Sequence, residues 1–322
     1  MAGQGLSFWG CGTSVAAEGT KCAAAEGAKM IQYEGSIYRP PSEARSLILQ
    51  ATIGCSNNQC AFCVAYQEKR FRVRPEADLF AEIDWVAGAM PEVRRVFLAD
   101  GDALVLSADR MLRILERLYD KLANLERVTA YGSPENLLQK SLTDLKRLRA
   151  AGLTMVYYGI ESGDDEVLKR IRKGATAKEI IEAGSRARQA GIDLSATVIL
   201  GLGGPNLSTR HAEATAGVLS TIAPRYASAL TLMVEPREPG FKEVFGDPKW
   251  RMLDAIETLA ECRLLLAGIE ADGIVFRSNH ASNYLSLAGD LQKDKQRLLK
   301  TIDDVLDDPD SRGIRPEHLR SL

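Results

Sequence analysis

Three cysteines lie close together near the start of the chain, directly after an apolar run typical of a buried strand. Cys55, Cys60 and Cys63 are half of the six cysteines in the protein. Thiolates are ligands for zinc and for iron–sulfur clusters, and a pair of thiols can cycle through a disulfide. The residue type and the spacing therefore predict a metal site or a redox-active loop.

Three kinds of site fit these cysteines. A closed zinc site takes a fourth nitrogen or sulfur ligand, and the three histidines of the chain all lie far from the loop in sequence. A redox dithiol needs only Cys60 and Cys63 and leaves Cys55 without a role. A [4Fe–4S] cluster on three thiolates keeps one iron open for a further ligand. The cysteines favour the cluster, and the other two interpretations stay open.

The elements around this loop alternate between β-rich apolar runs and amphipathic helical segments, as repeated βα units do. Val96-Phe97-Leu98-Ala99 is short, apolar and bounded by turn residues, like a buried parallel strand. Strands are predicted at 46–53, 94–99, 126–131, 154–160, 193–200 and 227–234, and helices at 76–89, 107–123, 142–151, 164–171, 177–190 and 206–222. Farther along, helices are predicted near 249–268 and 292–306, with a short strand at 274–276.

Six consecutive βα units predict an α/β fold, a partial (β/α)6 TIM-like barrel, with a doubly wound open sheet as the alternative. Residues 46–236 would form this core. Residues 1–45 would be an N-terminal extension, poorly ordered at its start, and residues 237–322 a C-terminal extension of helices and loops that closes the substrate side. Loops at the carboxyl ends of barrel strands carry the chemistry, and the cysteines lie in the first such loop.

The composition narrows the class of protein. A hydrophobic fraction of 45% and a charged fraction of 26% are ordinary for a globular protein. The net charge of −2 gives no reason to expect a nucleic-acid partner. No apolar run reaches the roughly 20 residues of a membrane helix, and no export signal is evident at the N-terminus. We therefore expect a cytoplasmic protein with neither a membrane nor a nucleic-acid partner.

The spacing Cys55-x4-Cys60-x2-Cys63, with Phe62 before the last cysteine, resembles the cluster loop of the radical SAM superfamily. The commonest family spacing has three residues between the first two cysteines. The spacing of four residues found here resembles that of a mostly uncharacterised group labelled by analogy with oxygen-independent coproporphyrinogen oxidase. The resemblance covers roughly residues 33–300. It implies a [4Fe–4S] cluster on the three cysteines and S-adenosyl-L-methionine (SAM) as a second cofactor.

The resemblance also implies residues that contact SAM. The segment Asp100-Gly101-Asp102 lies where the family has a turn that takes the methionyl amine through its backbone and carboxylate. Glu161 lies where the family contacts the ribose or methionine end of SAM. Lys173 aligns with a family arginine that pairs with the SAM carboxylate. A lysine offers a single point charge, whereas an arginine can bind a carboxylate through two parallel hydrogen bonds. Arg172 could substitute for Lys173. The remaining implied contacts are Phe62, Val198, Ile199 and Met233, of which the last three would also be explained by core packing.

The activity implied is reductive cleavage of SAM at the cluster, giving a 5′-deoxyadenosyl radical that acts on an unknown small-molecule substrate. A reducing partner such as flavodoxin or ferredoxin would supply the electron. On the substrate side, Arg277 and Asn279 could bind a carboxylate or phosphate, His280 could move a proton, and Tyr284 could donate a hydrogen atom or only pack. A well-capped turn would explain these residues equally well. Further pocket candidates are Tyr131, Glu135 and Glu235.

Two other classes of protein remain as alternatives. One is a non-catalytic iron–sulfur protein for electron transfer or cluster delivery, and the other is a zinc-stabilised α/β binding protein. Outside the loop only Cys11, Cys22 and Cys262 remain, too few for a second cluster with four thiolates. This count disfavours methylthiolation and twin-cluster peptide maturation. Cys262 lies among leucines in a predicted helix and is expected to be a buried apolar residue, with a role as hydrogen donor less favoured.

Overall fold

The computed structural model describes residues 30–234, 241–308 and 313–321. The predictions for residues 1–29, which include Cys11 and Cys22, and for Glu235 lie outside these described residues. The strands are β1 (Leu47–Gln50), β2 (Thr52–Ile53), β3 (Arg72–Val73), β4 (Arg95–Ala99), β5 (Arg127–Gly132), β6 (Leu153–Glu161), β7 (Asp193–Leu200), β8 (Tyr226–Thr231), β9 (Val275–Ser278) and β10 (Leu287–Asp290). The α-helices are α1 (Glu76–Ala89), α2 (Ala108–Lys121), α3 (Pro134–Leu138), α4 (Leu142–Ala150), α5 (Asp165–Arg170), α6 (Ala177–Gln189), α7 (Gly204–Ile222), α8 (Phe241–Phe245), α9 (Ala255–Gly268) and α10 (Lys295–Asp307).

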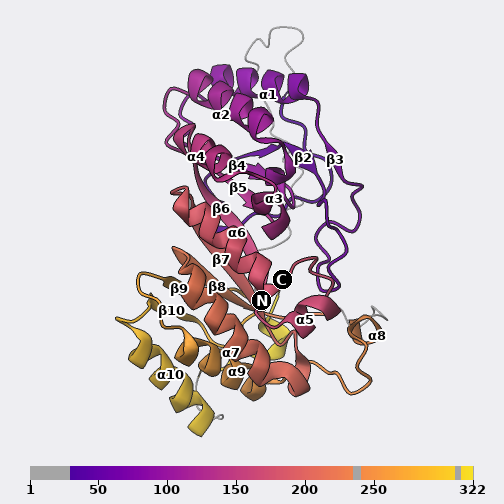
Figure 1. The fold of residues 1–322 in the computed structure, drawn as a ribbon, viewed down its shortest axis with the longest axis vertical. Coiled ribbons are helices and arrows are strands. Elements are labelled where there is room, and N and C mark those ends of the chain that lie inside the picture. The colour runs from indigo at the N-terminus through magenta and orange to yellow at the C-terminus, as the bar shows by residue number, and fades with distance from the viewer. Residues whose placement is uncertain (1–29, 235–240, 309–312, 322) are drawn as a thin grey trace, which may run out of the picture.

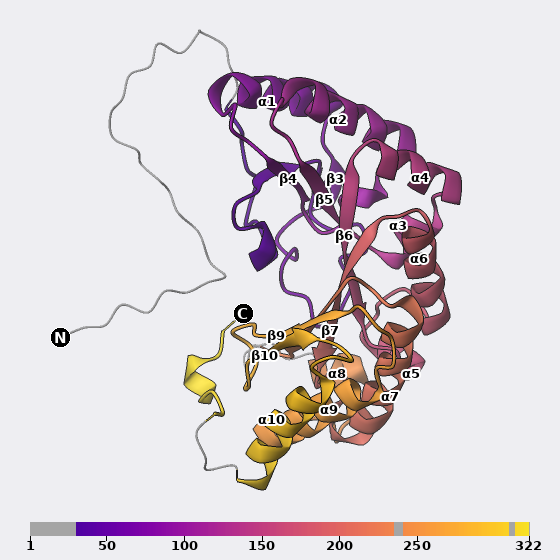
Figure 2. The same ribbon diagram turned by 90° about the vertical axis from the view of Figure 1, so that its left-hand side faces the viewer.

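One eight-stranded sheet runs through the molecule in the order β1-β4-β5-β6-β7-β8-β9-β10 (Figure 1). Neighbouring strands from β1 to β9 are parallel, and β10 pairs antiparallel with β9. Within the described residues the sheet has two free edges, β1 and β10, so it is a curved open sheet and not a closed barrel (Figure 2). The prediction of a partial TIM-like barrel is confirmed.

The last parallel strand extends the predicted barrel by one unit. The strand predicted at 274–276 was assigned to the C-terminal extension, whereas β9 pairs in parallel with β8, with Tyr226 opposite Val275. Helix α9 provides the crossover between these strands, as βα units require. The predicted helix near 249–268 begins only at Ala255, because Asp254 caps it by accepting a hydrogen bond from the Glu257 N–H.

Helices cover the outer face of the curved sheet, and the inner face of β7 is less enclosed. Figure 2 shows α1, α2, α4, α6 and α7 in an arc along the outer side. In β7, Val198 points to this side and is 1% exposed, whereas Thr197 and Ile199 point to the inner face and are only partly buried. Because side chains alternate along a strand, Val198 belongs to the helix-facing core. For Val198 the structure supports the alternative explanation of core packing.

The predicted strand at 46–53 is divided in the structure. Residues Leu47–Gln50 pair with β4 in the large sheet, but Thr52–Ile53 turn away and pair antiparallel with Arg72–Val73. This small second sheet brings together the two ends of the segment 54–71, which carries the three cysteines. The cysteine loop is thus closed at its base by backbone hydrogen bonds.

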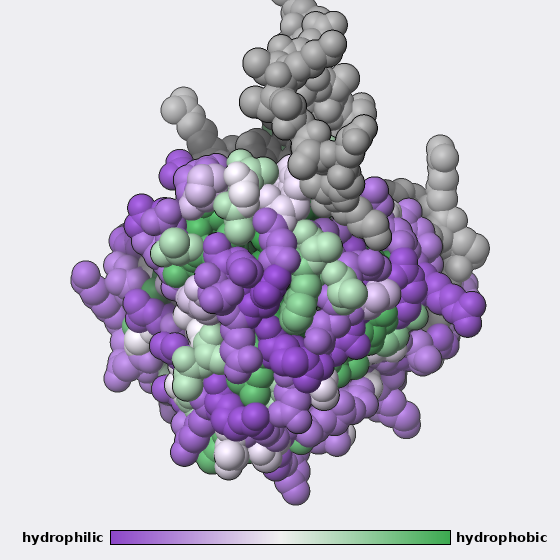
Figure 3. All heavy atoms as spheres, turned by 90° about the horizontal axis from the view of Figure 1, so that it is seen from above, coloured by the Kyte–Doolittle hydropathy of each residue, from purple (hydrophilic) through white to green (hydrophobic). Residues whose placement is uncertain are grey.

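Figure 3 shows one face of the molecular surface. At the end formed by α1 and α2 it is mainly hydrophilic, with apolar residues in small separate areas (Figure 3). None of the helices in the described residues combines the length and apolar character needed to cross a membrane. Scattered apolar residues of this kind are ordinary on protein surfaces.

Candidate metal centre

The three thiols lie on one loop at the carboxyl edge of the parallel strands. Cys55, Cys60 and Cys63 are free and partly buried. The N–H of Cys63 donates to the carbonyl of Cys60 at 3.1 Å, which makes a tight turn between these two residues. The side-chain amide of Asn57 donates to Cys60 Sγ at 3.1 Å. The loop therefore presents its sulfur atoms within a short, locally ordered stretch.

The turn that ends β4 holds one side of the cysteine loop. The Gly101 N–H donates to the carbonyl of Gly54 at 3.1 Å. A side chain at Gly101 would not fit, because a Cβ atom there would lie 2.5 Å from Cys55 Cβ. Asp102, 1% exposed, accepts hydrogen bonds from the Ser56 N–H at 3.2 Å and from the Ser56 hydroxyl. The predicted Asp100-Gly101-Asp102 turn thus contacts the first cysteine directly.

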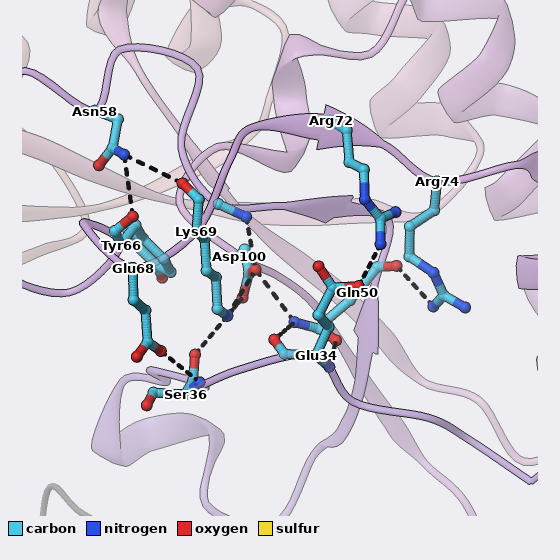
Figure 4. Close-up of polar contacts among 11 residues, drawn as sticks. Glu34, Ser36, Gln50, Asn58, Tyr66, Glu68, Lys69, Arg72, Arg74 and Asp100 are labelled. Carbon is cyan, nitrogen blue, oxygen red and sulfur yellow. Dashed lines mark hydrogen bonds and ion pairs between the residues drawn. The ribbon is translucent and has the colours of Figure 1, made fainter.

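Asp100 lies beneath the loop in a buried ion pair with Lys69 (Figure 4). The Lys69 ammonium lies 3.0 Å from Asp100 Oδ2, and the two side chains are 3% and 0% exposed. The same carboxylate accepts from the Gly54 N–H at 2.8 Å and from the Gln50 amide at 3.2 Å. Asp100, at the end of β4, therefore connects β1 with both ends of the cysteine loop.

The loop between α5 and α6 holds the other side of the cysteine loop. The Ala61 N–H donates to the carbonyl of Ile171 at 2.9 Å, and the Asn57 amide donates to the carbonyl of Lys173 at 3.2 Å. The Lys173 ammonium lies 3.0 Å from Glu161 Oε1, and both side chains are 10% exposed. The predicted residues Glu161 and Lys173 are therefore brought together beside the cysteines as an ion pair.

Glu161 adopts an unusual backbone conformation at the end of β6. Its φ of 64° is in the left-handed region, which non-glycine residues rarely adopt. The pairing of β6 with β7 shifts register between Gly159 and Glu161. The carboxylate turns back over Gly159, where a Cβ would lie 2.1 Å from Glu161 Oε1. Strain of this kind clusters at ligand sites and marks Glu161 as a functional candidate.

Burial controls the charges around the cysteines. Burial raises the pKa of all three thiols, and for Cys60 to about 11, against the opposing effect of Lys173. For Lys173, burial disfavours the ammonium, but the Glu161 carboxylate raises its pKa overall. The protein without metal therefore holds neutral thiols next to a charged lysine. Metal binding must displace the thiol protons.

The donor set fits a cluster better than a single ion. No group of three or more His, Cys, Asp or Glu side chains in residues 30–234, 241–308 and 313–321 is placed to hold one metal ion. The thiolates of a four-iron cluster bind separate irons, so they need not converge on one point. Three cysteines on one loop, with a charged lysine beside them and no fourth thiol on that loop, match a cluster with an open iron.

A buried polar network lies behind the ends of β6 and β7. The hydroxyl of Ser162 and His211 Nδ1 lie 2.7 Å apart, and His211 Nε2 lies 3.6 Å from Glu261 Oε1. That carboxylate accepts from the Gly201 N–H at 2.7 Å and from the Ser208 hydroxyl. The sequence analysis missed this network, since a single histidine on a helix gives no signal of its partners. The network positions the strand ends that carry Glu161 and Ile199.

The predicted substrate residues separate into two groups. Arg277 lies on β9 and Asn279 follows it, and both are exposed. His280 is held in a turn, with Nδ1 2.8 Å from the Ser282 hydroxyl. The Tyr284 hydroxyl donates to Glu317 at 2.8 Å, and burial and this carboxylate raise its pKa to about 12. For His280 and Tyr284 the structure supports the alternative of a well-capped turn.

The other predicted residues lie at varied positions around the site. Tyr131 belongs to an aromatic cluster on the inner face with Phe97, at 5.0 Å between ring centroids. Phe62 is partly buried against the main core, and Met233 is partly buried just after β8. Glu135 is exposed in the first turn of α3. Cys262 is buried in α9, as predicted.

The protonation of His280 gives a test of its surroundings. Burial, and next the charge of Arg315, lower the pKa of His280 to about 4, from an ordinary value near 6.5. Above about pH 6.5 the imidazole is neutral in both the folded and the unfolded chain. As the pH falls from there towards 4, only the unfolded chain takes up the proton, so folding is weakened. Urea unfolding at pH 7 and pH 5 should show a larger loss of stability for wild type than for His280→Gln; equal losses would contradict this assignment.

A surface cavity of about 420 Å³ adjoins the outside of the cysteine loop. It is open to solvent and lies between the loop and helices α5 and α6. Its lining residues are Asn57, Gln59, Asp165, Leu168, Lys169, Arg172, Gly174, Ala175, Thr176 and Glu179. Arg172, the predicted substitute for Lys173, is thus on the outer surface, away from the Glu161 carboxylate that Lys173 contacts.

The sequence model of the radical SAM superfamily matches residues 49–216, which include the cysteine loop and the ends of β4, β6 and β7. The chain belongs to the radical SAM superfamily. Enzymes of this family use a [4Fe–4S] cluster and SAM, so these are its cofactors.

Two curated proteins show the range of relatives. The heme chaperone HemW of Bacillus subtilis (strain 168) is 24% identical over 151 residues, which cover 46% of this chain and 38% of HemW. The tRNA-2-methylthio-N(6)-dimethylallyladenosine synthase of Anaeromyxobacter sp. (strain K) is 25% identical over 233 residues, 70% of this chain and 49% of the synthase. The matches span less than half the length of either relative.

Solved structures support the fold. Coproporphyrinogen III oxidase (HemN) from Escherichia coli, a radical SAM enzyme, superimposes with a TM-score of 0.53 at 17% identity, covering 69% of this chain and 51% of HemN. The methyltransferase TsrM from Kitasatospora setae, with cobalamin and a [4Fe–4S] cluster bound, gives a TM-score of 0.50 at 20% identity, covering 62% of this chain and 39% of TsrM. At these identities the likeness is one of fold.

Proposed function

We propose that this protein is a radical SAM enzyme that cleaves SAM reductively and uses the resulting 5′-deoxyadenosyl radical on a small-molecule substrate. One observation carries the proposal. The three cysteines are held at the carboxyl edge of the parallel sheet between the turn after β4 and the Glu161–Lys173 pair after β6. These are the positions from which a barrel of this type addresses its ligands.

In this proposal Cys55, Cys60 and Cys63 would hold the cluster, which would supply an electron for the reductive cleavage of SAM. Lys173 binds the SAM carboxylate. Its ammonium has three N–H donors, and the Glu161 contact at 3.0 Å uses only one of them. Glu161 in turn offers its other carboxylate oxygen to the amine or ribose of SAM.

The carboxylates after β4 have a different role in this proposal. Asp100 and Asp102 already accept several hydrogen bonds within the protein. We propose that they position the cysteine loop and that Glu161 provides the carboxylate facing SAM. Ile199 on the inner face of β7 and Met233 after β8 remain the proposed apolar contacts, with Phe62 beside the last cysteine.

The names of the relatives do not identify a substrate for this protein. They refer to heme, a tRNA nucleoside and coproporphyrinogen, and fold alone does not fix a substrate. The reductant is proposed to be a small electron-transfer protein such as flavodoxin or ferredoxin. The cavity outside the cysteine loop lies close to the cluster position and is the part of the surface where such a protein would approach.

An anaerobic cleavage assay tests the proposal. The reconstituted protein is incubated with SAM and dithionite, and 5′-deoxyadenosine and methionine are measured by chromatography and mass spectrometry. Both products should form in equal amounts and only when the reductant is present. A protein that carries the cluster but forms neither product would instead be the non-catalytic iron–sulfur protein. Metabolite extracts that increase 5′-deoxyadenosine formation would then identify the substrate.

A further inference from the structure

A row of polar side chains crosses the inner face of the sheet from β7 to β9. Gly159 pairs in register with Thr197, Thr197 with Ser228, and Ser228 with Arg277. Register partners in a sheet direct their side chains to the same face. Arg277 is therefore on the same face as Gly159, over which the Glu161–Lys173 pair lies.

This row departs from what a parallel sheet normally shows. Parallel strands are usually covered on both faces and are apolar throughout. On the β4–β6 side the inner face follows this rule, because Phe97, Tyr131 and Tyr157 fill it with edge-to-face ring contacts at 5.0–5.9 Å. On the β7–β9 side the same face carries the hydroxyls of Thr197 and Ser228 and the exposed guanidinium of Arg277, beside apolar residues such as Ile199. A polar row on the inner face is expected where a ligand or solvent is received.

The groups in this row have unused donors. Among the described residues, Arg277 makes one hydrogen bond, from Nη1 to the carbonyl of Phe276 at 3.0 Å, and none of their carboxylates forms an ion pair with it. Other arginines are paired with acids, as Arg113 is with Glu76 at 2.8 Å. No hydrogen bond is recorded for the hydroxyls of Thr197 and Ser228 among the described residues. A guanidinium next to one hydroxyl, with a second one strand further along the row, matches a carboxylate or phosphate group.

The distance across the sheet between Gly159 and Arg277 indicates that Arg277 binds the substrate and not SAM. Three strand intervals separate Gly159 from Arg277, about 14 Å across a flat sheet and less across a curved one. Lys173 is beside the cysteines, where its ammonium lies 3.0 Å from Glu161. An anion bound at Arg277 would therefore belong to a second molecule on the inner face.

We propose that Arg277, together with Ser228 and Thr197, binds an oxyanion group of the substrate, a carboxylate or a phosphate. That the bound molecule is the substrate rests on the proposed function. The binding of an oxyanion itself requires neither SAM cleavage nor a reductant. The substrate class is thus a small anionic molecule whose reacting carbon lies within about 14 Å of its anionic group. Exposed Asn279 directly follows β9 and would add a donor near its end.

Arginine-selective labelling tests this subsite on the reconstituted full-length protein. Phenylglyoxal modifies accessible arginines, and peptide mass spectrometry follows the rate at each one. Inorganic phosphate and acetate are the probes, at constant ionic strength maintained with sodium chloride. We expect saturating millimolar phosphate or acetate to slow the modification of Arg277 about fivefold, as weak oxyanion binding would. The stronger of the two probes distinguishes a phosphate from a carboxylate site.

Arg113 is the internal control, because it is half-exposed and already paired with Glu76. Its modification rate should not change with either probe. The double variant Thr197→Val/Ser228→Ala should reduce the protection of Arg277 several-fold. An Arg277 rate that is insensitive to both probes, or that falls only in step with that of Arg113, would overturn the subsite. Absence of SAM cleavage would count against the proposed function alone.

Discussion

Replacing Cys60 with alanine is expected to abolish cluster binding and reduce SAM cleavage to background. Cys60 lies in the centre of the loop, where its sulfur accepts a hydrogen bond from Asn57 and its carbonyl closes the turn to Cys63. Two remaining thiolates would leave two irons of the proposed cluster without protein ligands. Iron–sulfur absorbance, the EPR signal after reduction and 5′-deoxyadenosine formation should all be lost together.

Cys262→Ala is the matched control for this experiment. Cys262 is 2% exposed in α9, where burial raises the pKa of its thiol to about 12. Its loss should lower stability by roughly 1 kcal/mol and leave the absorbance and the cleavage activity intact. A Cys60→Ala protein with a full cluster spectrum would show that the loop does not hold the metal. Circular dichroism of both variants establishes that each is folded.

Lys69→Met should cause the largest loss of stability of any single change considered for this site. It leaves the carboxylate of Asp100, which is 0% exposed, without its counter-charge. Removing one partner of a buried pair typically costs about 3–5 kcal/mol, a large part of the 5–15 kcal/mol that stabilises a typical domain. Methionine retains most of the length of the lysine, so the loss reports the charge and not a cavity. Urea unfolding at pH 7 measures it.

Two comparisons sharpen this result. Arg94→Met removes a pair with Glu126 in which the side chains are 67% and 47% exposed, and it should cost at most about 1 kcal/mol. Adding Asp100→Asn to Lys69→Met removes the unpaired charge and should recover part of the stability. Equal losses for Lys69→Met and Arg94→Met, or no recovery in the double variant, would contradict a buried charge pair beneath the loop.

Local patterns predicted most of the sheet, and long-range pairings account for what they missed. The helix at 76–89 and the strand at 193–200 are found as predicted, because their periods and boundaries are encoded in neighbouring residues. The break after Gln50 was not predicted, since Thr52–Ile53 continue the same apolar run and their partner is the exposed pair Arg72–Val73. No local signal identifies that partner. The short helix α3 could have been found from the capping box of Ser133 and Asn136.

In the candidate site, too, local patterns were predicted and long-range contacts were missed. The cysteines and the segments after β4 and β6 were identified from spacing and resemblance, and the structure brings them together. Lys69 was missed because it lies between Glu68 and Arg70, in a charged run that reads as solvent-exposed. Its burial depends on Asp100, 31 residues away in sequence. The C-terminal residues were grouped by sequence proximity, whereas a strand followed by a turn directs Arg277 and His280 to different surroundings.

The four residues between Cys55 and Cys60 are not equivalent, and this limits how the loop could have changed its length. Ser56 is tied to Asp102, Asn57 to the carbonyl of Lys173, and Asn58 to the carbonyl of Tyr66 at 3.0 Å. Gln59 is exposed and lines the outer cavity. An evolutionary step between this spacing and the commoner three-residue spacing therefore passes most easily through insertion or deletion at Gln59. At any of the other three positions it would have required a compensating change in a distant segment.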